Sequence, residues 1–392
     1  MTTKSKDLYI TYFLVKHMST LDDKLHISVS RRRFLAGVTA LGAGAVAAAC
    51  SGGGKNESTP TVTSIPTTVF IPSSTPVPRE TPHYKIVPSS EGFYLGVFTQ
   101  DVSEPTALKN YIQKTGHIPS FFQIYANLSD GIFPSYLNPL YEAGSVPLIT
   151  LMPKKMVLDD ILQGKQDHNL AIKWANQLKK LEGAYFLRIA QEPNGNWDEW
   201  SGANNGGGQT NGYGNPNIPD GPERYVNMFR YVRDFLTNEG VHNATYVWTP
   251  NRGSVPDEAW NAHMNYYPGD DYVDWVGATT FNFGTSESWS HWESFARTVS
   301  DPYAIVSVTG KPFMLAEYAS VETGGDKAKW LDEHFVTLSD GSFPLMRAAA
   351  YSDYNFAHDN TWRLDSSPAA FAAWKRNVET GLFSTKVSVV SD

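Results

Sequence analysis

The chain has 392 residues, of which 13% are aromatic and 18% charged, and its formal net charge at pH 7 is -8. The negative charge argues against nucleic acid or an anionic membrane surface as the main partner, because both require a basic face, and it leaves neutral glycans open. Cys50 is the single cysteine, which excludes an internal disulfide and a cysteine-based zinc cluster. The ten histidines show no metal-ligand spacing, so we expect neither a metal nor another cofactor.

The N-terminal segment, residues 1–50, resembles an export signal. Three arginines, Arg31 to Arg33, precede an apolar run from Phe34 to Ala49, which is short of the about 20 apolar residues that span a bilayer. Twin arginines before such a run resemble a bacterial twin-arginine signal, and Ala47-Ala48-Ala49-Cys50 resembles a lipobox. We therefore expect export, with the protein secreted or held on the outer face of the cell membrane by a lipid on Cys50. Cleavage without lipidation and a buried apolar helix remain as alternatives.

A spacer and one large domain follow the signal. Residues 51–85 are rich in Ser, Thr and Pro, as in Ser74-Thr75-Pro76-Val77-Pro78, and have too little apolar surface to fold, so we expect a semi-extended linker. From residue 86 to residue 392 the pattern changes to short apolar runs that alternate with longer amphipathic ones. We expect this part to be one monomeric domain that touches the membrane only through the N-terminal lipid anchor.

Eight candidate strands alternate with amphipathic helical segments in this domain. The strands are expected at residues 93–98, 121–125, 146–151, 185–190, 245–249, 273–279, 313–316 and 346–351. Helices are expected, among others, at residues 106–115, 169–181, 222–239, 326–338 and 368–378. This alternation over about 300 residues predicts the α/β class and a (β/α)8 TIM barrel. A doubly wound sheet is the alternative, but no glycine fingerprint follows the first strand.

Two glutamates lie at the ends of predicted strands. In a (β/α)8 barrel the working side chains stand at the carboxyl ends of the strands. Glu192 follows the fourth predicted strand, and Glu317 follows the seventh. Glycoside hydrolysis requires two carboxyl groups that face one cavity, because one donates a proton to the leaving oxygen and the other attacks or activates water. For either glutamate alone a structural ion pair is the alternative, with Arg188 as the obvious partner.

The residues around both glutamates resemble one known family. The run Arg188-x-x-Gln191-Glu192-x-Asn194-Gly195-x-Trp197 resembles the fourth-strand signature of glycoside hydrolase family 26. Residues 267–277 resemble the run into the family's sixth strand, residues 311–318 resemble its nucleophile segment, and Trp248-Thr249-Pro250-Asn251 also fits. The resemblance covers about residues 90–380. It implies a barrel enzyme that cuts a β-1,4-linked polysaccharide, in the first place β-mannan, within the chain and with retention. Glu192 is then the acid/base and Glu317 the nucleophile.

Two positions depart from the family pattern. Gln191 stands where mannanases of the family carry His, and Phe281 stands where a Tyr hydrogen-bonds the nucleophile. Gln cannot carry a charge and Phe cannot donate a hydrogen bond, so Tyr318 or Tyr351 would have to supply the hydroxyl. These departures widen the expected substrates to mixed-linkage β-glucan and β-xylan. They also leave open a catalytically weak lipoprotein that binds glycans without cutting them.

Sugar binding requires flat apolar faces together with polar groups for the sugar hydroxyls. We expect the aromatic faces from Trp197, Trp200, Trp248 and Trp362, with packing in the core or at the rim as at least an equal alternative for each ring, above all for Trp248 inside its strand. The other expected substrate-binding residues are Arg188, Gln191, Asn194, Asn251, Phe281, Asn282, Tyr318 and Arg363. The expected partner is therefore a neutral β-linked polysaccharide.

Overall fold

The computed structural model describes residues 83–99, 104–355 and 361–391. The expected signal, the expected lipidation residue Cys50 and nearly all of the expected linker lie outside these residues. The first strand, β1 (Tyr84–Val87), begins within the segment expected to be linker, so Tyr84 and Lys85 belong to the folded domain. In the described parts of the chain, no helix is long and apolar enough to cross a membrane.

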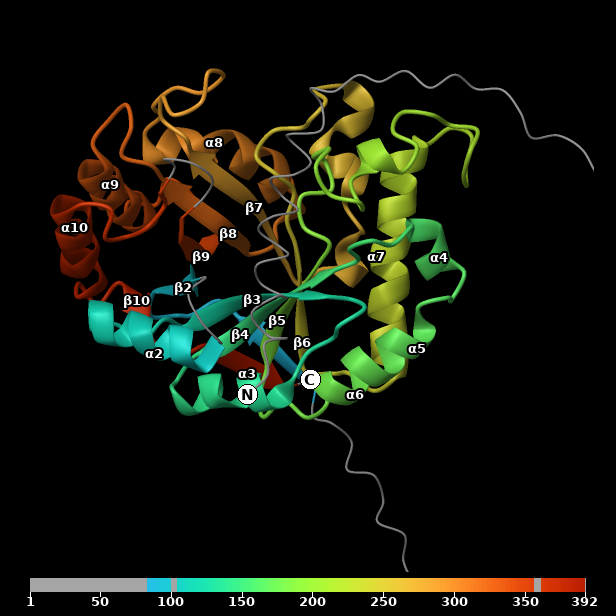
Figure 1. Ribbon diagram of the computed structural model, residues 1–392, viewed down its shortest axis with the longest axis horizontal. Coiled ribbons are helices and arrows are strands. Elements are labelled where there is room, and N and C mark those ends of the chain that lie inside the picture. The colour runs from blue at the N-terminus through green and yellow to red at the C-terminus, as the bar shows by residue number, and fades with distance from the viewer. Residues whose placement is uncertain (1–82, 100–103, 356–360, 392) are drawn as a thin grey trace, which may run out of the picture. The chain divides into compact units, whose positions relative to one another are not determined.

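Eight parallel strands of the described chain, β2 to β9, close into a barrel (Figure 1). Their bounds are β2 (Phe93–Thr99), β3 (Phe121–Asn127), β4 (Val146–Met152), β5 (Tyr185–Ile189), β6 (Ala244–Trp248), β7 (Trp275–Asn282), β8 (Phe313–Ser320) and β9 (Met346–Asp353). The first and last of these strands pair from Tyr94 with Ala348 to Thr99 with Asp353, which closes the sheet. Every strand expected from the sequence is present, and the predicted (β/α)8 barrel is confirmed.

Helices follow every strand of the described barrel except β6, which short 3-10 turns connect to β7, and they surround the barrel (Figure 1). They are α2 (Glu104–Thr115), α3 (Pro134–Glu142), α4 (Leu158–Leu162), α5 (Asp167–Asn169), α6 (Asn176–Leu178), α7 (Asp220–Asn238), α8 (Phe295–Val306), α9 (Lys327–Ser339) and α10 (Pro368–Val378). Short 3-10 turns lie at η3 (Gly202–Asn204), η4 (Ala259–Asn261), η5 (His263–Tyr266), η6 (Asp270–Tyr272) and η7 (Ser307–Thr309). On α7 the buried residues Tyr225, Phe229, Val232 and Leu236 follow helical spacing, so one apolar stripe packs on the barrel.

One expected helix is not continuous. The segment expected at residues 169–181 consists of α5, a π-helical turn η2 (Leu170–Ala175) and α6. Within that turn the Lys173 carbonyl accepts a hydrogen bond from the Ile132 amide, 3.3 Å away on another segment. The sequence pattern predicted the apolar face of this segment but not its π-helical turn. That turn occurs together with a hydrogen bond from Ile132, which lies outside the segment and cannot be read from its local sequence.

The barrel interior is apolar near the amino ends of the strands and polar toward their carboxyl ends. Ile86 of β1 and Phe186 and Trp275 of the barrel belong to one buried cluster. The strand β1 pairs antiparallel with β11 (Ser388–Ser391), and Trp275 Nε1 donates to the Ile86 carbonyl at 2.8 Å, so this small sheet covers the amino-terminal end. The two-residue strand β10 (Phe383–Ser384) extends the sheet beside β2. Arg188, two residues after Phe186, faces the same side of β5 and begins the polar part.

Candidate active site

A β-bulge on β8 directs Glu317 into the barrel. Ala278 of β7 pairs with Leu315, but the next residue, Thr279, pairs with Glu317, so Ala316 is the extra residue on β8. Ala316 belongs to the apolar interior cluster, and Glu317, directly after it, forms a hydrogen bond with Arg188 from the far side of the interior. A bulge changes which face a side chain takes, and here two consecutive side chains point inward.

Arg188 and Glu317 form a buried ion pair. Arg188 Nη2 donates to Glu317 Oε1 at 2.9 Å, and the two side chains are 0% and 3% exposed. Arg188 Nε donates to Thr150 Oγ1 at 3.0 Å, which fixes the plane of the guanidinium. The ion pair considered above as the alternative for a single glutamate is therefore present. Among the described residues, no hydrogen bond reaches the second oxygen, Glu317 Oε2.

The burial of this pair points to a role other than stability. Removing two charges from water costs several kcal/mol for each ion, and a well-packed apolar pair of similar volume is often as stable or more so. A buried pair with one carboxylate oxygen left over is, by contrast, what a positioned nucleophile requires. The pair therefore does not count against a catalytic Glu317.

Gln123 of β3 connects the ion pair to the bulge. Its side chain is fully buried in the barrel. With the amide oriented to satisfy all its neighbours, Oε1 accepts from Arg188 Nη2 at 2.6 Å and Nε2 donates to the Ala316 carbonyl at 3.0 Å. One side chain thus holds both the cation and the backbone that precedes Glu317. Gln123 was not among the residues predicted from the sequence, although a polar residue inside the apolar run Phe121-Phe122-Gln123-Ile124 was a usable signal.

Glu192 lies on strained backbone at the carboxyl end of β5. Its φ is +54° and that of Ala190 is +49°, in the left-handed region that non-glycine residues rarely adopt. Such positions cost about 1–3 kcal/mol each and cluster at functional sites. The Glu192 amide donates to the Thr249 carbonyl at 2.9 Å, which ties the strained turn to the end of β6.

Both carboxylate oxygens of Glu192 accept hydrogen bonds. Trp197 Nε1 donates to Oε2 at 2.9 Å, and the Thr279 hydroxyl donates to Oε1. Thr279 is also the residue that pairs with Glu317 between β7 and β8. Neighbouring strands lie about 4.8 Å apart, so the Glu192 carboxyl contacts a residue whose backbone is adjacent to Glu317. The structure therefore brings the two glutamates to the same end of the barrel through Thr279, which the sequence analysis did not single out.

Two of the expected sugar platforms are core residues. Trp200 and Trp248 are both 0% exposed. Trp200 Nε1 donates to the Gln191 carbonyl at 2.7 Å and thereby holds the Glu192 turn, while Trp248 packs edge-on against Tyr267 at 5.2 Å. The expectation that these rings present faces to a sugar is wrong, because the helices and loops around the barrel cover them. Trp197, partly exposed, keeps its predicted place beside Glu192.

The aromatic residues after β7 and β9 pack against one another. Trp362 is 1% exposed and stacks on Phe281 with a centroid distance of 4.0 Å and an interplanar angle of 9°. The expectation that Trp362 presents a face to a sugar is therefore wrong, since the ring is buried and the partly exposed Phe281 stacks on one of its faces. Tyr318 Oη lies 3.4 Å from His334 Nδ1 outside the barrel, and Tyr351 Oη donates to the Trp362 carbonyl at 2.9 Å. Neither tyrosine supplies the hydroxyl that Phe281 lacks.

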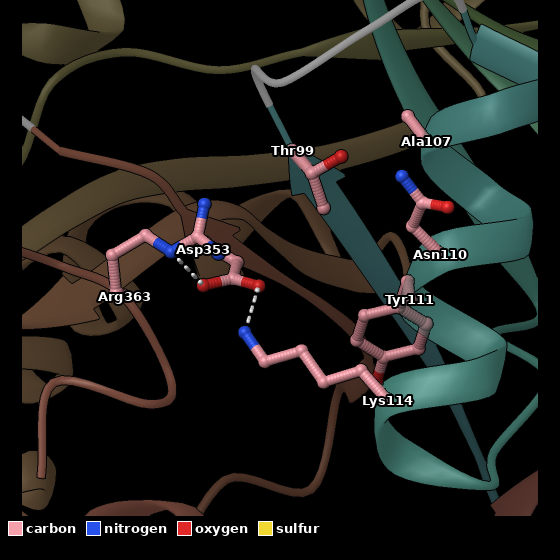
Figure 2. A pocket seen from close by; sticks show the side chains of 7 residues that line it. All are labelled: Thr99, Ala107, Asn110, Tyr111, Lys114, Asp353 and Arg363. Carbon is pink, nitrogen blue, oxygen red and sulfur yellow. Dashed lines mark hydrogen bonds and ion pairs between the residues drawn. The ribbon is translucent and has the colours of Figure 1, made fainter.

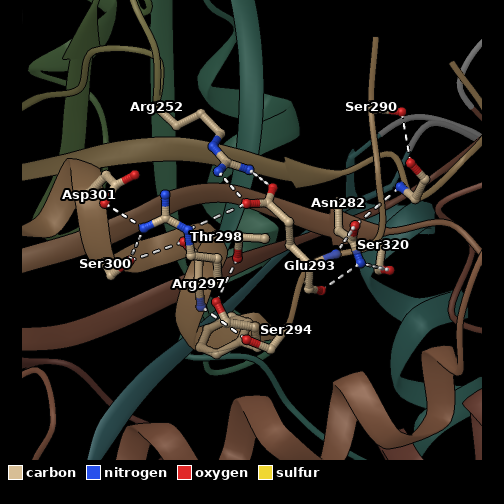
Figure 3. A network of polar contacts seen from close by, with 12 residues as sticks. Arg252, Asn282, Ser290, Glu293, Ser294, Arg297, Thr298, Ser300, Asp301 and Ser320 are labelled. Atoms are coloured by element: carbon tan, nitrogen blue, oxygen red, sulfur yellow. Dashed lines mark hydrogen bonds and ion pairs between the residues drawn. The ribbon is translucent and has the colours of Figure 1, made fainter. Parts of the chain in front are cut away.

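Several of the polar residues expected to bind the substrate form hydrogen bonds that connect loops of the protein. Asn194 accepts from the Asn251 amide at 2.8 Å and donates to the Asn251 carbonyl at 3.1 Å. Asn282 donates to the Glu293 carbonyl at 3.1 Å (Figure 3). Asn194 and Asn282 are buried, whereas Asn251 is partly exposed. Gln191 differs from these residues, because its buried Oε1 has no hydrogen-bond partner among the described residues. A buried acceptor without a partner is uncommon in proteins, and this one lies next to Glu192.

Arg363 lines a small cavity of about 50 Å³ at the carboxyl ends of β2 and β9, beside α2 (Figure 2). Its Nε lies 3.6 Å from Asp353 and 3.3 Å from Asp365, and Lys114 lies 3.2 Å from Asp353. The other lining residues are Thr99, Ala107, Asn110 and Tyr111. The cavity is therefore bordered by paired charges. In the described residues, no group of three His, Cys, Asp or Glu side chains is arranged to hold a metal ion.

Known proteins resemble this chain in sequence and in fold. Endoglucanase H of Acetivibrio thermocellus is 29% identical over 295 residues, which are 74% of this chain and 31% of that protein. The chain thus spans about a third of the length of that curated relative. The catalytic domain of a family 26 endo-β-1,4-mannanase from Bacillus sp. JAMB-750 has a TM-score of 0.57 at 16% identity, covering 79% of this chain and 96% of that one.

A Cellulomonas fimi endo-β-1,4-mannanase double mutant has a TM-score of 0.56 at 17% identity and covers 75% of this chain and 72% of that one. At such identities the likeness to the two solved structures shows the barrel fold alone. The model of glycosyl hydrolase family 26 matches residues 101–334, more than half of the chain and including both glutamates. The chain therefore belongs to glycosyl hydrolase family 26.

Proposed function

We propose that this protein is a retaining endo-β-glycanase in which Glu317 is the nucleophile and Glu192 the acid/base. The observation that carries the proposal is the double role of Thr279, whose hydroxyl binds Glu192 and whose backbone pairs with Glu317. Retaining enzymes hold their carboxyl groups about 5–5.5 Å apart, whereas inverting enzymes leave about 6.5–9.5 Å for a water. Because Thr279 contacts Glu192 and is the strand neighbour of Glu317, the two carboxyl groups should lie close together, and this favours the shorter spacing of a retaining enzyme.

The contacts of each glutamate fit its role. Arg188 holds Glu317 Oε1, so Oε2 attacks the anomeric carbon while the bond from that carbon to the leaving oxygen breaks. Glu192 gives its proton to the leaving oxygen in the same step. Water then transfers a proton to Glu192 and attacks the same carbon, which releases Glu317. Trp197 and Thr279 hold the carboxyl group of Glu192, which carries its proton before the first step, and an incoming sugar displaces the contact of the partly exposed Trp197.

A β-glucan with β-1,4 bonds, alone or in mixed linkage, is the substrate we propose ahead of β-mannan. The relative named Endoglucanase H is 29% identical, whereas the two mannanase structures described above are 16% and 17% identical. Gln191 and Phe281 also depart from the mannanase pattern at positions beside the two glutamates. These observations favour a glucan, and β-mannan and β-xylan are the competing outcomes of the test.

The roles are tested with purified Glu192→Gln and Glu317→Gln variants on lichenan, β-mannan and xylan, with the exposed Glu239→Gln as a matched control. We expect at least a 100-fold loss of reducing-end release for both catalytic variants and none for the control, since acid/base catalysis alone contributes about 10²–10⁴-fold. Proton NMR of the first products should show the β-anomer. An α-anomer would refute retention, and full activity of either variant would refute its role.

We also propose that the protein is exported and tethered to the outer face of the membrane through Cys50. The support is the arginine-led apolar run followed by the chain's single cysteine and a Ser/Thr/Pro-rich segment. Such a tether would hold the barrel at a distance from the bilayer, where a polymer can enter it. In the native host, Cys50→Ser should move the protein from the membrane fraction to the medium. An unchanged membrane fraction would contradict lipid anchoring at this residue.

A further inference from the structure

The loop between β7 and α8 carries an exposed tryptophan that no part of the proposed mechanism uses. Trp289 is 70% exposed, whereas Trp200, Trp248 and Trp362 are nearly or fully buried. Tryptophan is rarely left in water without a reason, since it offers a large apolar face. The loop follows the strand that supplies Thr279, so it leaves the barrel at the catalytic end.

A row of aromatic rings connects Trp289 with the catalytic centre. Trp289 packs edge-on against Phe283 with ring centroids 5.1 Å apart. Phe283 in turn lies 5.6 Å from Trp362, and Trp362 stacks on Phe281. Phe281 faces the same side of β7 as Thr279, two residues earlier, which binds Glu192. Trp289 is thus the exposed outer end of a row of packed aromatic rings that begins beside the site, with Trp362 buried in the row and Phe281 and Phe283 partly exposed.

Polar contacts hold both ends of the loop (Figure 3). Asn282 Nδ2 donates to the backbone carbonyl of Glu293 at 3.1 Å, and Asn282 Oδ1 accepts from the backbone N–H of Gly284 at 3.1 Å. Arg252 forms two hydrogen bonds with the Glu293 carboxylate, of 2.6 Å and 3.1 Å. Burial raises the pKa of the Glu293 carboxyl group, but the hydrogen bond from Arg252 and the positive charge of its guanidinium lower that pKa by more. The net shift is downward, so Arg252 and Glu293 are both ionised at neutral pH.

Within the loop, Ser290 Oγ donates to the Gly284 carbonyl at 2.8 Å, directly after Trp289 (Figure 3). The Thr285 amide donates to the Thr323 carbonyl at 3.1 Å, which ties the loop to the segment after β8. A ring held on an anchored loop loses little conformational entropy when a ligand stacks on it. Trp289 is therefore presented as a fixed platform.

We propose that Trp289 is a stacking platform for a sugar residue of the polysaccharide outside the catalytic centre, and this rests on the proposed glycanase function. The ligand is a neutral β-linked glucan chain, long enough to extend from Glu192 and Glu317 past the partly exposed Phe281 and Phe283 to the loop. A flat indole face matches the apolar face of a pyranose ring, and the neutral polymer brings no charge that the acidic protein would repel. Short substrates that end near the two glutamates do not reach Trp289.

The inference is tested with Trp289→Ala and Trp289→Phe, assayed on lichenan and on an aryl β-cellobioside. For Trp289→Ala we expect the KM for lichenan, and its Kd in affinity electrophoresis, to rise on the order of tenfold with kcat unchanged. The aryl glycoside kinetics should stay at the wild-type level, and Trp289→Phe should recover most of the affinity. Tyr136→Ala on α3, which removes another exposed aromatic ring, is the matched control and should change nothing.

The outcomes separate the platform from the proposed function. A wild-type protein that cuts lichenan, with a Trp289→Ala variant of equal KM and Kd, overturns the platform and leaves the glycanase intact. An equal loss on lichenan and on the aryl glycoside also overturns it, because the residue would then act on the catalytic centre. A wild-type protein that neither cuts nor binds any β-glycan overturns both. Thermal unfolding of Trp289→Ala should match the wild type, since the side chain is mostly in water.

Discussion

Arg188→Met removes the cation of the buried pair and keeps a flexible side chain in its place. In the wild type Arg188 is 0% exposed and donates to Glu317 Oε1 at 2.9 Å and to Thr150 Oγ1 at 3.0 Å. The variant leaves the Glu317 carboxylate buried without its partner, and breaking a buried pair in this way costs about 3–5 kcal/mol. We expect a loss of unfolding free energy of that size together with the loss of hydrolysis.

Adding Glu317→Leu to Arg188→Met removes the second charge as well. Because no charge is then buried, the double variant should regain the lost unfolding free energy. In other proteins, replacing a buried ion pair by apolar residues has raised the unfolding free energy by about 1–4 kcal/mol over the wild type. Hydrolysis should remain absent, since the proposed nucleophile is gone. The pair would then be present for catalysis at the expense of stability.

Urea unfolding followed by tryptophan fluorescence measures both steps, and lichenan hydrolysis reports the function. Equal m-values for the variants would show that the unfolding free energies are comparable. Two results refute the reasoning: an Arg188→Met variant as stable as the wild type, or a double variant no more stable than Arg188→Met alone. An active double variant would remove Glu317 from the mechanism.

Two further predictions concern Thr279 and a buried histidine. Thr279→Val removes the hydroxyl that binds Glu192, so kcat on lichenan should fall about tenfold, while kcat on an aryl glycoside with an activated leaving group should fall less. Thr279→Ser keeps a hydroxyl and should stay active. Equal losses of kcat on both substrates would contradict the link between Thr279 and proton donation. Burial lowers the pKa of His334 to about 3, so the unfolded chain takes up the proton first and stability should fall as the pH drops below about 6.5, by up to about 1.4 kcal/mol per pH unit. His334→Phe should remove this share of the slope in pH-dependent urea unfolding, and an unchanged slope would refute it.

Local sequence patterns determined the barrel. Each strand, such as Val146–Met152, is an apolar run bounded by turns, and each long helix, such as Asp220–Asn238, has one apolar stripe. These patterns depend on neighbours in sequence and on burial on one or both faces, so they can be read without tertiary contacts. The strand-end position of Glu192 could be read in the same way, because its motif is contiguous.

Only the tertiary structure decided which side chains meet. The bulge at Ala316 depends on the register of β7 against β8, and a register is a property of two strands that no local pattern contains. Trp200 and Trp248 could not be told from sugar platforms, because packing and stacking select the same residue type. Thr279 and Gln123 escaped notice since their partners lie on other strands. The sequence by itself therefore determined the fold and the strands at which the two glutamates lie, and long-range register and burial decided how those glutamates are held.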